Sequence, residues 1–102
     1  NMKIKIENIS DNVANDILVY RICIVKNKDK IWECSTAIKY DVIKANDELK
    51  VELKTEEIHE DKYTIQFDFK CKDKYGEEHK YHVYAFCENN SSTPYFSLKE
   101  IS

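Results

Sequence analysis

Apolar and polar residues alternate with a period of two along most of the chain. The clearest series are 2–7, 49–53 and 63–71, in which every second residue is apolar. Successive side chains of a strand point to opposite faces, so each series predicts a strand with one buried face. Residues 16–26 are apolar at both parities apart from Arg21, which predicts a central strand covered on both sides. Shorter strands are predicted at 30–34, 36–43 and 94–101.

Polar segments rich in Asn, Asp and Ser separate these runs. With one Gly and one Pro in the chain, Asn and Asp must supply most of the turn geometry. Segment 44–58 is the single helix candidate, with Asn46 or Asp47 as its N-cap, but the two-residue spacing of its apolar positions favours a strand. Turn signals about every 8–12 residues predict an all-β fold, an antiparallel immunoglobulin-like β-sandwich of seven to eight strands.

The stretch 67–86, FDFKCKDKYGEEHKYHVYAF, predicts a hairpin. A two-residue turn at Tyr75-Gly76 would set the apolar face of one strand against the polar face of the other. A type I turn followed by a left-handed Gly76 in a bulge keeps the apolar odd positions together. We therefore predict the bulged register, whose pairs are Cys71 with His79, Phe69 with Tyr81, Phe67 with Val83, Ile65 with Ala85 and Tyr63 with Cys87.

The same register places two large aromatic side chains, Tyr84 and Phe86, on the outer face of the hairpin. Asp68 then faces His82, as an exposed pair of modest structural value. Two interpretations of the aromatic pair stay open. The 94–101 segment could cover both side chains, or they could form an exposed patch for a protein partner.

Composition excludes several classes of protein. The length of 102 residues fits a single domain over 1–102, and 42% hydrophobic with 34% charged residues is typical of a globular chain. A formal net charge of −3 argues against nucleic-acid binding, which needs a basic surface. No apolar run approaches the roughly 20 residues that span a bilayer, so no membrane span is predicted.

The four cysteines are Cys23, Cys34, Cys71 and Cys87. None forms a C-x-x-C pair, so the usual zinc and redox spacings are missing. Free thiols are favoured over two disulfides. Met2 leads directly into Lys-Ile-Lys-Ile without the apolar region of a signal peptide. Both features favour a cytoplasmic location, while an extracellular one stays open for a domain of a longer chain.

Cys71 and His79 carry the sharpest candidate chemistry. As cross-strand neighbours they could share a metal ion, but two further ligands are needed and Phe69 and Tyr81 follow on that face. They could also supply a thiolate and its base, yet no glycine-rich elbow or helix N-terminus offers an oxyanion hole. We therefore predict no catalytic residue, no metal and no cofactor.

Residues 60–65, EDKYTI, resemble the corner before strand F of immunoglobulin-like and fibronectin-like sandwiches, with Tyr63 as the corner tyrosine. Ile65 stands where antibody domains carry their second cysteine, so the inter-sheet disulfide is absent from its usual place. Trp32 follows Cys23 by nine residues, in the region where such domains carry a core tryptophan.

Residues 6–22, IENISDNVANDILVYRI, resemble the opening of bacterial adhesion-type immunoglobulin-like domains, in which the residues matching Asn8 and Ala14 shape a turn. Residues 72–84 similarly resemble the hairpin before the last strand of those domains. The resemblance implies a sandwich used for spacing or binding, without catalytic residues.

These observations predict a non-enzymatic interaction or spacer module with a protein partner or flanking domains, and they are compatible with one domain of a larger bacterial protein. Tyr84 and Phe86 are the expected binding residues. The alternative is a carbohydrate or cell-surface binding module, with exposed Trp32 and Tyr40 as stacking platforms. A small enzyme is the third option, and the absence of converging polar residues disfavours it.

Overall fold

A computed structural model describes residues 2–55, 62–88 and 95–98, and these fold into eight strands without a helix. The prediction of an all-β chain of seven to eight strands is confirmed. Segment 44–58 forms a strand over part of its length, so the helical alternative is wrong there. The strands are β1 (Met2–Asn8), β2 (Ala14–Lys26), β3 (Asp29–Cys34), β4 (Ile38–Ile43), β5 (Glu48–Leu53), β6 (Lys62–Lys72), β7 (Glu78–Glu88) and β8 (Tyr95–Leu98).

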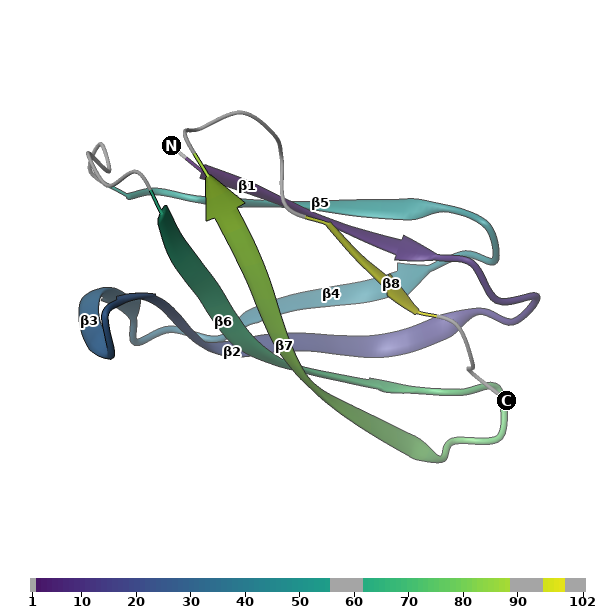
Figure 1. The fold of residues 1–102 in the computed structure, drawn as a ribbon. Helices are drawn as coiled ribbons and strands as arrows, with labels where there is room; N and C mark the ends of the chain where they lie inside the picture. Colours follow the sequence, from purple (N-terminus) through teal and green to yellow (C-terminus); the bar gives the residue numbers. More distant parts are fainter. Residues whose placement is uncertain (1, 56–61, 89–94, 99–102) are drawn as a thin grey trace.

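The smaller sheet has three strands in the order β5-β1-β8. β1 pairs antiparallel with β5, but β8 runs parallel to β1 from Lys5↔Tyr95 to Asn8↔Leu98. The expectation of a purely antiparallel fold is therefore wrong for this pair. In Figure 1, β7 runs toward the end of the molecule at which β1 starts, so a strand that follows β7 and runs back has the same direction as β1.

The larger sheet has five strands built around β2, which is 13 residues long. One edge of β2 pairs with β6, and the other pairs first with β4 and then with β3. β7 lies beyond β6, joined to it by an unbroken register of pairs. Figure 1 shows the two sheets as two layers, with β6 and β7 running obliquely to β1 and β5.

Between the two sheets lies one hydrophobic cluster to which both contribute. The alternating positions of β6 enter it as predicted, and Phe67 and Phe69 are its largest fully buried side chains. Burial of a phenylalanine side chain contributes about 1.5–3 kcal/mol, so this strand anchors the fold. The buried members are Ile4, Ile6, Ala14, Ile17, Val19, Ile22, Ile24, Ile43, Val51, Leu53, Tyr63, Ile65, Phe67, Phe69, Cys71, Val83 and Cys87.

Two irregularities explain why β2 is apolar at both parities. Its register with β6 shifts between Asn15 and Leu18 and again between Tyr20 and Cys23. Asp16 and Arg21 have φ values of 49° and 51° at these two places. Before the second shift the odd-numbered residues Ile17 and Val19 face the core, and after it the even-numbered residues Ile22 and Ile24 do. The apolar run therefore reflects a change of phase, and the expected cover on both faces is wrong.

Asn8 shapes the turn between β1 and β2. Its side-chain amide donates hydrogen bonds to the carbonyl oxygens of Asn12 (2.8 Å) and Ile43 (3.1 Å). Its side-chain oxygen accepts from the backbone N–H and the hydroxyl of Ser10. Asn8 is fully buried, and Ala14 at the start of β2 is also buried. A buried polar group of this kind is tolerated because every bond it lost to water is replaced.

The hairpin between β6 and β7 adopts the predicted register, with Cys71 opposite His79 and Phe67 opposite Val83. Gly76 has φ of +81°, and its N–H donates to the carbonyl of Asp73 at 3.0 Å. The Asp73 carboxylate accepts from the backbone N–H groups of Tyr75 and Glu77 and bonds His79 Nε2 at 2.9 Å. The bond from His79 and those backbone N–H groups hold the pKa of Asp73 below its usual value.

Replacing Gly76 with alanine should lower the free energy of unfolding by about 1 kcal/mol. An added Cβ at Gly76 meets no atom within 4 Å, so the expected loss comes from the left-handed backbone alone. Gly76→Asn should lose less, because asparagine tolerates this region. Chemical denaturation of the three proteins measures the order. Equal stability of all three would contradict the bulged turn.

Candidate interaction surface

Tyr84 and Phe86 lie on the outer face of β7 and are 63% and 79% exposed. The interpretation that the C-terminal segment covers them is wrong for its described part, because β8 pairs with β1 in the other sheet. Phe96 on β8 packs at the inner side instead, with ring centroids 6.4 Å from Phe69 and 5.8 Å from Tyr81. Residues 99–101 lie outside the described part of the chain. Two neighbouring aromatic side chains thus face solvent.

A cluster of polar side chains lies next to this aromatic pair on the same face of the sheet. Asp68 faces His82 as predicted, and its carboxylate forms a hydrogen bond with His82 Nδ1. The other carboxylate oxygen lies 3.4 Å from Arg21 Nη1. The His82 ring meets the Tyr84 ring edge to face, with centroids 4.6 Å apart. Asp68 therefore orients His82, and the imidazole packs against the Tyr84 ring.

Tyr20 extends the surface onto β2. Arg21 and Lys70 place their cationic groups 5.8 Å and 5.9 Å from the centre of the Tyr20 ring. Tyr20 lies opposite Asp68 across the β2–β6 pair, so it continues the row that holds His82. We define the aromatic face as Tyr20, His82, Tyr84 and Phe86.

Trp32 and Tyr40, the predicted stacking platforms, are not brought together. Trp32 on β3 pairs with Ile24, whereas Tyr40 on β4 pairs with Ile17. These two partners lie seven positions apart along β2, which corresponds to roughly 20 Å. Both aromatic side chains are half-buried and pack against the core, and burial raises the pKa of the Tyr40 phenol.

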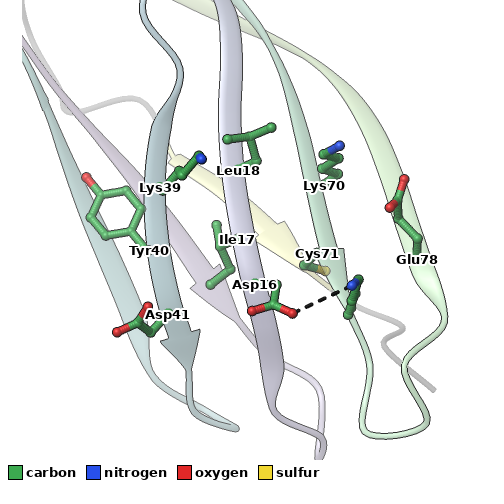
Figure 2. Close-up of a pocket in the computed structure, with 10 residues that line it drawn as sticks. Asp16, Ile17, Leu18, Lys39, Tyr40, Asp41, Lys70, Cys71 and Glu78 are labelled. Atoms are coloured by element: carbon green, nitrogen blue, oxygen red, sulfur yellow. Dashed lines mark ion pairs between the residues drawn. The ribbon is translucent and has the colours of Figure 1, made fainter.

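A shallow groove of about 420 Å³ lies beside the aromatic face, between β4 and the β6–β7 hairpin. Figure 2 shows acidic and basic side chains around its rim, including the Asp16–Lys72 ion pair at 3.8 Å. Leu18 and Ile17 form part of its apolar wall. Opposite charges balance here: the three carboxylates are Asp16, Asp41 and Glu78, and the three ammonium groups are Lys39, Lys70 and Lys72.

Three of the cysteines are buried, and burial makes their thiols harder to deprotonate. All four are free, and burial raises the pKa of Cys71 to about 11 and those of Cys23 and Cys87 above their usual value. Cys71 would therefore be protonated at neutral pH, whereas nucleophilic attack needs the thiolate. His79, its cross-strand neighbour, is bonded to Asp73. Within residues 2–55, 62–88 and 95–98, no three His, Cys, Asp or Glu side chains gather where a metal could bind.

The sequence placed Tyr84, Phe86 and the Asp68–His82 pair on one face, and the structure shows them there. It did not reveal Tyr20 and Arg21 as neighbours of this face, because the shift in β2 changes which residues point outward. The signal that could have found them is Arg21 itself. A lone arginine in an apolar run marks a position where the strand turns a different side to solvent.

No helix in the described part of the chain has the length and apolar character needed to cross a membrane. In comparisons with known proteins, no protein-family model, no curated protein and no solved structure matches the chain.

Proposed function

We propose that this protein is a non-enzymatic immunoglobulin-like β-sandwich that serves as an interaction module, a binding or spacer domain for a protein partner. The observation that carries the proposal is the exposure of Tyr84 and Phe86 side by side on one sheet face. Tyrosine and phenylalanine are enriched in the cores of protein interfaces because each contributes a large rigid area. The His82 ring packs against Tyr84 on the same face.

The strand order supports the immunoglobulin-like assignment. In that fold strand E pairs with B, and strands C, F and G follow one another in the facing sheet. Here β5 pairs with β1, and β2, β6 and β7 follow one another, which matches β1 to strand B and β2 to strand C. The turn at Asn8 then lies between strands B and C, so the likeness of residues 6–22 to the opening of such domains does not fit this strand order. Tyr63 stands near the start of β6, where the corner tyrosine of strand F is expected. Trp32 departs from the pattern, since it lies on β3 and not on the strand that pairs with β6.

The carbohydrate alternative receives less support. Sugar rings stack on exposed aromatic faces, and both Trp32 and Tyr40 pack against the core. An enzyme is also less well supported, because the Cys71 thiol is buried and the groove beside it holds balanced charges. The aromatic face remains the best candidate for recognition of another protein surface.

Photo-crosslinking tests the proposal. The full chain carries the photoreactive residue benzoylphenylalanine in place of Tyr84 and is irradiated in the cells that produce it. Tyr75 is the matched control, because it is 75% exposed and aromatic but sits on the hairpin turn. We expect one discrete adduct from position 84 and none from position 75. Equal labelling at both positions, or none at either, would contradict a binding role for the aromatic face.

A further inference from the structure

β7 forms one edge of the five-stranded sheet, and among the described residues it pairs only with β6. The hydrogen bond from Asp73 N–H to Glu77 carbonyl fixes which backbone groups remain free. Antiparallel pairs alternate between bonded and non-bonded positions, so the odd residues of β7 bond to β6. The N–H and C=O groups of the even residues from 78 to 86 therefore point away from β6, toward the edge of the sheet.

This edge has none of the backbone features that commonly prevent pairing with another chain, which are a proline, a bulge or a short strand. Its charged side chains, among them Lys80 and Glu88, can still pair with opposite charges of a partner strand. β7 is 11 residues long, contains no proline and keeps an unbroken register with β6. β3 and β4, at the opposite edge, have only six residues each. β7 is thus the better template for an added strand.

We propose that β7 pairs antiparallel with β7 of a second copy of this chain, which joins the two larger sheets into one across a two-fold axis. This inference rests on the proposed interaction function and names its partner. A two-fold axis perpendicular to the sheet keeps the aromatic faces of both copies on one side. Because only even residues present free backbone groups, even residues must face even residues across the junction.

The charged side chains of β7 favour one of the registers in which even residues face even residues. With the axis at Tyr84, Lys80 faces Glu88 of the second copy, and this pair occurs twice by symmetry. His82 then faces Phe86, and the two Tyr84 side chains meet on the axis. Lys80 and Glu88 are 68% and 61% exposed, so both can reach a new partner while they keep their present contacts with Glu78 and Lys62.

The neighbouring registers lack this complementarity. An axis at Val83 sets Glu78 against Glu88 of the second copy, and like charges directly opposite each other are unfavourable. An axis at His82 sets Glu78 against Phe86 and leaves Lys80 facing Tyr84. Of these three registers, the axis at Tyr84 is the one that pairs Lys80 with Glu88 and keeps the aromatic side chains together.

The inner side of β7 fits the same register. Tyr81 and Ala85 are only half-buried, although the inward residues of β6 beside them are fully buried. With the axis at Tyr84, Ala85 faces Val83 of the second copy and Tyr81 faces Cys87. The junction would therefore continue an apolar inner face from one sheet into the next, and it would reduce the exposure of both half-buried side chains.

Sedimentation velocity of the full chain tests the pairing. We expect a dimer whose dissociation constant rises about tenfold in Lys80→Glu and in Glu88→Lys, since each change turns two attractions into repulsions. The double variant Lys80→Glu/Glu88→Lys should restore the dimer. Lys50→Glu, a matched reversal on β5 in the other sheet, should have no effect. Circular dichroism confirms that each variant is folded.

A monomer at every concentration would overturn the pairing, and so would a dimer that both single reversals leave intact. The crosslink at position 84 separates this failure from failure of the proposed function. An adduct of twice the chain mass supports the second copy as partner. An adduct with a different protein overturns the self-pairing and leaves the interaction function standing.

Discussion

Replacing Phe67 with alanine should lower the free energy of unfolding by about 3–5 kcal/mol, the range typical of a fully buried phenylalanine. Phe67 is 1% exposed and lies at the middle of β6, between the two sheets. Truncation removes its transfer energy and leaves a cavity that the surrounding strands fill only partly. Because domains of this size have total stabilities of about 5–15 kcal/mol, the variant should be largely unfolded on mild warming.

Phe86→Ala is the matched control on the same hairpin. The side chain is 79% exposed, so its removal should change the free energy of unfolding by no more than about 0.5 kcal/mol. Urea denaturation followed by circular dichroism measures both variants. A large loss in Phe86→Ala would show that this side chain belongs to the core and would remove it from the aromatic face.

Replacing Asn8 with leucine should lower the free energy of unfolding by about 3 kcal/mol, although leucine is more hydrophobic. The amide of Asn8 is the donor to the carbonyls of Asn12 and Ile43, and its oxygen is the acceptor for Ser10. Leucine would leave these buried groups without that partner, and each such group is unfavourable by about 1–3 kcal/mol. Denaturation midpoints of the variant and the wild type measure the loss.

Two further variants at this turn test whether the loss comes from the hydrogen bonds of the Asn8 amide. Ser10→Ala removes one hydroxyl and should lose only about 1 kcal/mol. Asn8→Asp keeps the shape of the side chain but sets a carboxylate oxygen against the carbonyls of Asn12 and Ile43, so it should also destabilise at neutral pH. Full stability of Asn8→Leu would mean that the turn holds without its buried amide.

The β6–β7 hairpin was predictable because its information is local. One glycine, a two-residue period and the penalty for setting apolar side chains against polar ones are enough to select a single register. The outer position of Tyr84 and Phe86 followed from the same argument. Their exposure did not, because it depends on where β8 lies, and the sequence of β8 is equally apolar whether it joins one sheet or the other.

β2 shows why the remaining features were not predictable. Its apolar run fits a strand covered on both sides and also fits a strand that changes phase at Arg21. Periodicity alone does not separate these two arrangements, since a bulge moves the period by one residue. The relation of Trp32 to Tyr40 was lost for the same kind of reason, because their distance depends on how β3 and β4 share one edge of β2.

The parallel pairing of β1 with β8 has a mechanical consequence. The start of β1 and the end of β8 lie toward opposite ends of the molecule (Figure 1). A pulling force transmitted through these two ends would slide β1 and β8 past each other along their length. Such a shear loads all hydrogen bonds of the pair at once, whereas an antiparallel pair pulled from one end opens bond by bond. Tension applied at these two ends would therefore load the β1–β8 pair in shear.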